Sequence, residues 1–102
     1  MPRSAPIIEP FAVAANVTSR TGVLPTDVAL IYGAGPVGLN LLQVLKKVHG
    51  IKAYITDHFD ERLALARACG ASDDEIINTS REALPEALVK RGGEGGPTLI
   101  YG

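Results

Sequence analysis

The feature that most limits the fold of this chain is an uncharged stretch of 18 residues, Val28 to Leu45. It opens with strand-forming residues, Val28 to Tyr32, and continues through Gly33-Ala34-Gly35-Pro36-Val37-Gly38. A membrane-spanning helix would not be expected to hold three glycines and a proline in its middle. The stretch therefore predicts a strand buried on both faces, a tight turn, and a helix that runs to about Val48.

One face of this helix is apolar, and Gly50 is placed to end it. The positions that we expect to point toward the sheet are Val37, Leu41, Val44, Leu45 and Val48.

The same alternation of strand and helix continues to the end of the chain. Further strands are predicted at 52–56, 75–78 and 98–101, and further helices at 60–69 and 85–91. This pattern predicts right-handed crossovers and a parallel sheet with helices on both faces. We expect an α/β fold, a three-layer Rossmann-type half-domain with strand order 3-2-1-4.

The N-terminal part is less regular. Residues 1–6 read as a loose leader, and a helix is predicted from Pro10 to about Ser19, so residues 1–25 form a leading helix and loop. Residues 26–102 hold the βαβαβαβ pattern, and the chain is expected to be a single partial NAD(P)-binding domain. Its fourth strand would present an open sheet edge, which predicts a homodimer joined there.

Composition excludes several partners. Ten basic and eleven acidic side chains give a net charge of −1, which provides no electrostatic footprint for nucleic acid or an anionic membrane. Cys69 is the only cysteine, which favours a reducing compartment and a cytoplasmic location. We interpret Cys69 as a small buried hydrophobe, and the acidic run Asp73 to Glu75 as a solvated turn. His49, His58 and Cys69 do not have the spacing of metal ligands, so no metal site is predicted.

The glycine turn carries the chemistry. Gly33 permits the tight turn, Gly35 lets a pyrophosphate approach the backbone, and Gly38 lets the helix pack closely on the strand. The unpaired amides that open the helix point at the phosphate, and the helix dipole adds positive potential. Pro36 has no N–H, so Val37 and its neighbours are the expected donors.

An acid follows at the position that this motif requires. Asp57 lies 19 residues after Gly38, at the end of the second strand. Its carboxylate is suited to accept hydrogen bonds from both adenosine ribose hydroxyls and to repel a 2′-phosphate, which favours NAD over NADP. His58 and Arg62 lie nearby, and Arg62 is long enough to reach a ribose hydroxyl, or a 2′-phosphate in an enzyme that also uses NADP.

Together these residues resemble one family. The runs Glu9-Pro10-Phe11-Ala12-Val13-Ala14 and Val28 to Leu39, followed by Asp57, Arg62 and Gly70-Ala71, are similar to zinc-type medium-chain alcohol dehydrogenases. The nearest branch is that of sorbitol, threonine and L-galactonate dehydrogenases and related starvation-sensing proteins. The resemblance covers residues 7–101.

The resemblance implies a dinucleotide-binding domain of a zinc-dependent alcohol, polyol or sugar-acid dehydrogenase. Gly33, Gly35, Val37 and Gly38 match its pyrophosphate loop, Asp57 its ribose-binding acid, and Arg62 its supporting base. Glu9 matches a carboxylate near the catalytic zinc, which in this family polarises the alcohol oxygen.

The family's Cys, His and Glu zinc ligands and the second half of its sheet are not in this sequence. We therefore expect no bound zinc and no catalysis from the 102 residues, and weak or no binding of cofactor. Two alternatives to a dehydrogenase are a non-catalytic nucleotide-sensing module and a methyltransferase. Glu9-Pro10 disfavours the first, and Val37, where a methyltransferase glycine would stand, disfavours the second.

Overall fold

A computed structural model describes residues 3–5, 22–92 and 96–102. Within these residues, five parallel strands form one sheet in the order β1-β5-β2-β3-β4. The strands are β1 (Arg3–Ala5), β2 (Val28–Tyr32), β3 (Lys52–Asp57), β4 (Ile76–Asn78) and β5 (Leu99–Tyr101). The predicted order 3-2-1-4 is confirmed, because β4, β3, β2 and β5 lie side by side in that sequence.

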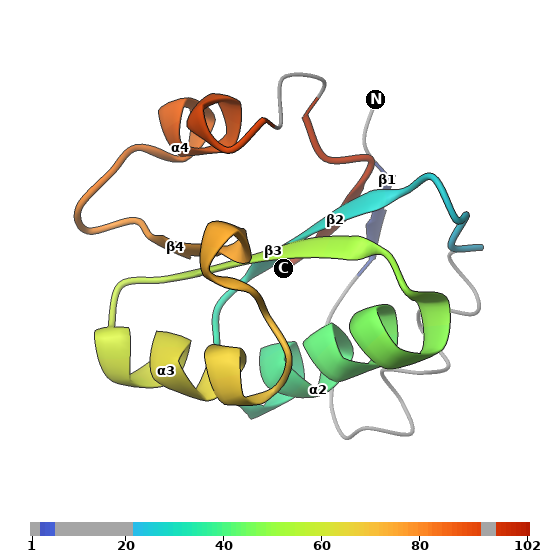
Figure 1. Ribbon diagram of the computed structural model, residues 1–102, viewed down its shortest axis with the longest axis horizontal. Helices are drawn as coiled ribbons and strands as arrows, with labels where there is room; N and C mark the ends of the chain where they lie inside the picture. The colour runs from blue at the N-terminus through green and yellow to red at the C-terminus, as the bar shows by residue number, and fades with distance from the viewer. Residues whose placement is uncertain (1–2, 6–21, 93–95) are drawn as a thin grey trace.

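Helices cover both faces of the sheet, as predicted. They are α2 (Pro36–Val44), α3 (Asp60–Ala68) and α4 (Leu84–Lys90). Figure 1 shows α2 and α3 below the sheet and α4 above it. Two short turns complete the described part, a π-helix at Leu45–His49 and a 3-10 helix at Asp73–Glu75. The helix predicted at 10–19 lies outside the described residues.

The expected loose leader and open fourth-strand edge are wrong. β1 pairs in parallel with β5, with Arg3 opposite Leu99 and Ala5 opposite Tyr101. The edge through which a homodimer was predicted is therefore occupied by the chain's own N-terminal residues. A strand of three residues carries too little periodicity to be recognised in a sequence.

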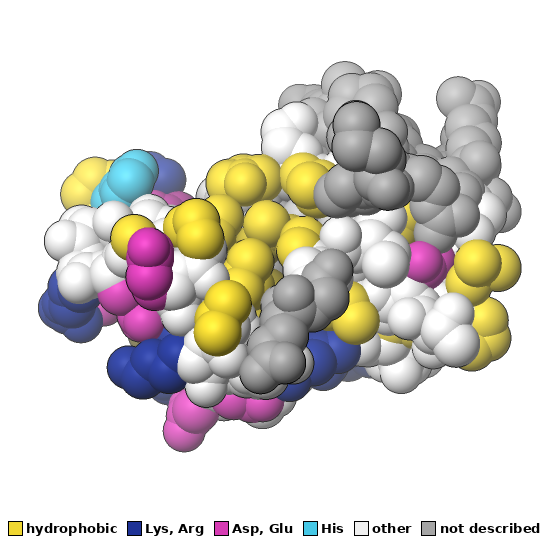
Figure 2. Space-filling view, turned by 90° about the horizontal axis from the view of Figure 1, so that it is seen from above, with side chains coloured by type: hydrophobic (Ala, Val, Ile, Leu, Met, Phe, Trp, Pro, Cys, Tyr) yellow, Lys and Arg dark blue, Asp and Glu magenta, His cyan; other side chains and the backbone are white. Residues whose placement is uncertain are grey.

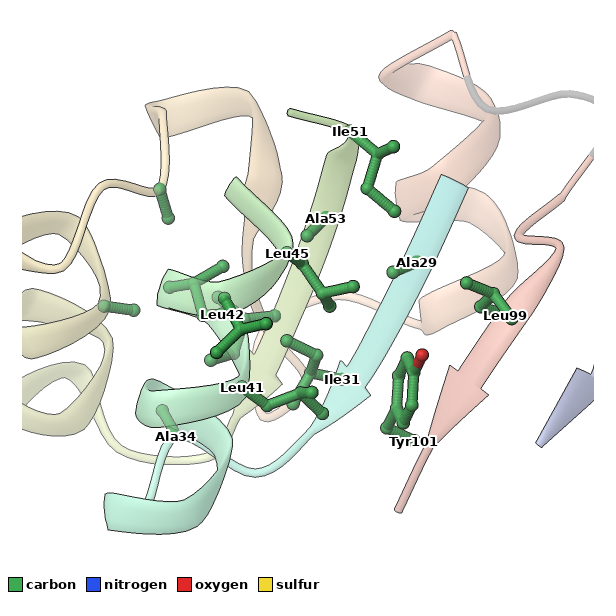
Figure 3. Packing of buried hydrophobic residues seen from close by; sticks show 14 of the residues in the cluster. Ala29, Ile31, Ala34, Leu41, Leu42, Leu45, Ile51, Ala53, Leu99 and Tyr101 are labelled. Carbon is green, nitrogen blue, oxygen red and sulfur yellow. The ribbon is translucent and has the colours of Figure 1, made fainter. Parts of the chain in front are cut away.

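Strand residues are buried on both faces because both faces meet helices. Leu41 of α2 and Leu45 of the π-helix pack against Ala29 and Ile31 of β2, as Figure 3 shows. On the opposite face Leu30, Tyr54 and Ile77 pack with Ala87 and Leu88 of α4. This second cluster is smaller than the first. At the surface, Figure 2 shows apolar side chains at the centre of the face viewed from above.

The end of the first long helix differs from the prediction. Val48 was expected to face the sheet but is 68% exposed. The last turn is a π-helix, whose i→i+5 hydrogen bonds widen the turn and change which side chains face inward. Leu42 is buried instead. Gly50 ends the helix with φ 66°, as predicted.

The acidic turn before β4 also differs. Glu75 was expected in a solvated turn at the start of a strand, yet it is fully buried and closes the 3-10 helix before β4. Its neighbour Asp73 is exposed, as expected. Burial of Glu75 follows from the hydrogen bonds that it accepts, which include two from Lys46.

Candidate nucleotide-binding site

The glycine turn leaves β2 in the predicted conformation. Gly33 has φ +99°, a value that L side chains rarely adopt, and its N–H donates to the Thr56 carbonyl at 2.8 Å. The turn therefore needs a glycine at position 33, and it is tied to the end of β3.

The other two glycines serve the two different purposes expected of them. A Cβ on Gly38 would lie 2.1 Å from the Gly33 carbonyl oxygen, so the first turn of α2 approaches the loop too closely for any side chain. A Cβ on Gly35 would meet nothing within 4 Å. The space at Gly35 is open, whereas the space at Gly38 is filled by the backbone of the protein.

The start of α2 presents backbone N–H donors. Gly35 is the N-cap residue without a side-chain cap, and Pro36 occupies the first helical position. Leu39 N–H is the first to donate within the helix, to the Gly35 carbonyl at 2.9 Å. The amides of Val37 and Gly38 precede it and have no partner in the helix, which leaves them available to an anion.

The Asp57 carboxylate lies beside this turn. Its Oδ2 accepts from the Ala34 N–H at 2.9 Å, and its Oδ1 accepts from the N–H groups of His58 at 2.6 Å and Phe59 at 3.2 Å. Arg62 Nη1 lies 3.7 Å from Oδ2. Glycine turn and acid therefore belong to one site, held together by a direct hydrogen bond.

These contacts keep Asp57 ionised. Burial by itself would raise the pKa of Asp57, but the amides of Ala34, His58 and Phe59 and the charge of Arg62 outweigh burial and lower that pKa below its ordinary value. An ionised acceptor at this place favours hydroxyl donors and disfavours a phosphate.

A pocket of about 520 Å³ opens beside Asp57. Its lining comes from the carboxyl ends of β2, β3 and β4 and from the loop before α4. The lining residues are Tyr32, Gly33, Thr56, Asp57, His58, Phe59, Arg62, Thr79, Glu82, Ala83 and Leu84. The Arg62 guanidinium stands over the Phe59 ring, 5.1 Å from its centre, and forms part of one wall.

No family model matches the chain. Individual proteins do. It is 45% identical to the starvation-sensing protein RspB of Escherichia coli K12 over 97 residues, which are 94% of this chain and 27% of that protein. It is 38% identical to (R,R)-butanediol dehydrogenase of Neisseria gonorrhoeae over 91 residues, 89% of this chain and 25% of that protein.

Solved structures agree. The alcohol dehydrogenase RspB of Escherichia coli CFT073, in complex with NADH, superimposes with a TM-score of 0.77 at 45% identity, covering 92% of this chain and 27% of that one. The alcohol dehydrogenase TADH of Thermus sp. ATN1 gives 0.73 at 30% identity, covering 88% and 26%. The chain belongs to the zinc-type, medium-chain alcohol dehydrogenase family. It spans about a quarter of the length of these dehydrogenases.

At this candidate site the structure brings together most of the residues singled out in the sequence. Gly33, Asp57, His58 and Arg62 line the pocket, and the Ala34 hydrogen bond places the turn at its margin. Pro36 and Val37 lie beyond the lining, at the start of α2. Glu9 lies outside the described residues.

The sequence missed the pocket wall that follows β4. Thr79 donates its N–H to the Asp57 carbonyl at 3.1 Å and its hydroxyl lies 3.1 Å from His58 Nδ1. Glu82 to Leu84 complete this wall. The sequence signal for this wall was its position after a strand, because ligands of open parallel sheets bind at the carboxyl ends of the strands.

Among the described residues, no group of three His, Cys, Asp or Glu side chains is arranged to hold a metal ion. None of the helices in that part of the chain is long and apolar enough to cross a bilayer.

Proposed function

We propose that this chain binds NAD(H), as the dinucleotide-binding part of a zinc-dependent alcohol, polyol or sugar-acid dehydrogenase. The observation that carries the proposal is the hydrogen bond from the Ala34 N–H to Asp57 Oδ2, because it joins a phosphate-binding turn and a ribose-binding acid at one pocket. Family membership supports a dehydrogenase over a nucleotide-sensing module or a methyltransferase. RspB, a relative at 45% identity, was solved with NADH.

Each site residue has a role in this proposal. The N–H groups of Val37 and Gly38 bind the diphosphate, with Gly35 leaving the room that it needs and Pro36 fixing the start of the helix. Gly33 supplies the turn. These groups bind a diphosphate without a lysine or arginine in the turn.

The adenosine half lies in the pocket. Asp57 accepts a ribose hydroxyl, Arg62 flanks the same ribose, and His58 forms part of the adjoining wall. The buried, ionised Asp57 supports NAD over NADP, since a 2′-phosphate would meet its charge. Residues 1–102 then act as one partial NAD(P)-binding domain, and a cytoplasmic location stays a prediction.

The chemistry would come from the bound groups. NAD would supply the hydride acceptor, and the zinc implied for the full-length family would polarise the alcohol oxygen. This chain would contribute binding and orientation, because the start of α2 would hold the diphosphate and Asp57 the ribose. Glu9 is the residue of this chain that we place near that zinc.

Substitution of Gly35 by alanine tests the proposal. Gly35 has φ −81° and open space around its Cβ, so the variant should fold normally. The added methyl would occupy the place of the diphosphate, and we expect NADH affinity to fall by about tenfold or more. Titration followed by NADH fluorescence or amide chemical shifts measures this effect.

The exposed Lys47→Ala change, at the opposite end of the helix, is the matched control and should bind as the wild type does. Wild-type protein that shows no shift with millimolar NADH or NAD would disprove the proposed function. Equal affinity of Gly35→Ala and wild type would show that the diphosphate lies elsewhere.

A further inference from the structure

The Asp57 carboxylate is largely occupied before any ligand arrives. An ionised carboxylate offers about four acceptor positions. Backbone N–H groups take three of them, His58 and Phe59 on Oδ1 and Ala34 on Oδ2. One position on Oδ2 is left to face the pocket, which suffices for one ribose hydroxyl rather than the two expected from the sequence.

The bond to Ala34 has a different purpose from the bonds to His58 and Phe59. The latter hold the chain at the end of β3, next to the acid itself. Ala34 is 23 residues away, fully buried, and stands between Gly33 and Gly35 in the phosphate-binding turn. A charge-assisted hydrogen bond from a side chain therefore fixes the backbone of the turn.

The turn is held from two further sides. Gly33 N–H donates to the Thr56 carbonyl at 2.8 Å, a bond that any residue at position 56 would provide. Gly38 packs against the Gly33 carbonyl. Asp57 thus supplies the side-chain contact that sets the direction of the Gly33–Ala34 peptide, and with it the path of the chain into the start of α2.

We infer that Asp57 is a positioning residue for the diphosphate-binding turn, in addition to the ribose acceptor of the proposed function. Diphosphate binding and ribose recognition are then coupled through one carboxylate. A substitution of Asp57 that admits a 2′-phosphate would also loosen the turn, so a change of cofactor preference at this position should weaken diphosphate binding in both NAD and NADP.

A ligand without ribose hydroxyls separates the two roles. 2′,3′-Dideoxy-ADP keeps the diphosphate but offers Asp57 no hydroxyl. If Asp57 served the ribose alone, Asp57→Asn would bind this ligand as the wild type does, or more tightly, because a negative charge near an anion is removed. We expect instead an affinity about tenfold lower, since the charge-assisted bond to Ala34 is lost.

Asp74→Asn is the matched control. It removes one carboxylate charge at the other end of β3, where Asp74 is half exposed and pairs with Lys52. Its affinity for dideoxy-ADP should equal that of wild type. Equal or tighter binding of dideoxy-ADP by Asp57→Asn would overturn the inference while leaving the proposed function in place.

A measurement without ligand makes the test independent of binding. In Asp57→Asn the Ala34 amide should exchange with solvent about tenfold faster than in wild type, because its charged acceptor is gone. In wild-type protein the Ala34 amide proton resonance should move as Asp57 is protonated in acid, which decides the matter even if the variant does not fold. A pH-independent Ala34 resonance would overturn the inference, whereas failure of wild type to bind ADP would overturn only the proposed function.

Discussion

Two buried carboxylates lie at opposite ends of β3, and they differ in what remains for a ligand. Asp57, at the carboxyl end, is 7% exposed and lines a pocket. Glu75, next to the amino end, is 1% exposed and does not line that pocket. Both accept backbone hydrogen bonds and both have a lowered pKa.

Every acceptor position of Glu75 is used within the protein. Lys46 Nζ lies 2.8 Å from Oε1 and 2.7 Å from Oε2. The Ala53 N–H donates to Oε2 at 2.9 Å, and the Ser72 N–H and hydroxyl donate to Oε1 at 2.9 and 2.7 Å. The network joins the π-turn, β3 and the start of the 3-10 helix.

The comparison distinguishes Asp57, a carboxylate that lines the candidate site, from Glu75, a carboxylate that stabilises the fold. Burial and a lowered pKa are common to both, so neither property identifies the functional acid. Asp57 keeps one acceptor position directed at a pocket, and its fixed partners belong to the phosphate-binding turn. The acceptor positions of Glu75 are taken by Lys46, by the Ala53 N–H and by Ser72.

The largest effect should follow Glu75→Ala. Loss of this carboxylate leaves Lys46, the buried Ala53 N–H and the part-buried Ser72 N–H without their acceptor. We expect the free energy of unfolding to fall by about 3 kcal/mol. NADH affinity of the folded fraction should not change. Urea denaturation measures the loss, with the exposed Asp74→Ala as control; a loss below about 1 kcal/mol would contradict the role given to Glu75.

Gly38→Ala should have the next largest effect, on binding. Its Cβ would stand 2.1 Å from the Gly33 carbonyl oxygen, so the turn and α2 must move apart. Overpacking of this kind costs about 2 kcal/mol, which corresponds to about a thirtyfold loss of NADH affinity if the strain falls on the site. Asn40→Ala in the same helix is the control, and NADH titration of both variants measures the difference. Wild-type affinity in Gly38→Ala would refute the close approach.

The functional end of the sheet was predictable because its requirements are local. A turn that leaves a strand with positive φ needs Gly33, a close helix needs Gly38, and an acid at the end of the next strand needs only the strand spacing. Each requirement appears in the sequence as a residue type at a fixed position.

The opposite end of the sheet, around Glu75, was not predictable because its contacts join residues far apart in the sequence. Glu75 and Lys46 meet across 29 residues, and nothing in the run Asp73 to Glu75 tells which acid turns inward. The π-turn that exposes Val48 depends on tertiary packing. Pairing of β1 with β5 joins residues 96 apart in sequence, Arg3 with Leu99.

Acid should weaken the fold through both carboxylates. A group with a lowered folded-state pKa stabilises the protein above its unfolded pKa, near 3.8 for Asp57 and 4.5 for Glu75, and loses that contribution as the pH falls through the folded value. Urea midpoints should therefore decline below about pH 4, and less steeply in Glu75→Gln. A constant midpoint between about pH 5 and pH 3 would contradict the network.

The smallest effects should come from the cations that accompany the two acids, and they should be unequal. Arg62 is 56% exposed and lies 3.7 Å from Asp57, so Arg62→Gln should change the free energy of unfolding by less than about 0.5 kcal/mol. Lys46 is 24% exposed and binds both oxygens of Glu75, so Lys46→Gln should cost about 1 kcal/mol.

The two cation variants should also differ in NADH binding, where Arg62→Gln should have the larger effect. Arg62→Gln removes a wall of the pocket and should weaken NADH binding, whereas Lys46→Gln lies at the far end of the sheet and should leave it unchanged. Paired urea and NADH titrations measure both quantities. A larger loss of stability in Arg62→Gln than in Lys46→Gln would contradict the assignment of Asp57 to ligand binding and Glu75 to fold stability. Asp57 would then depend on its cation for stability as Glu75 does.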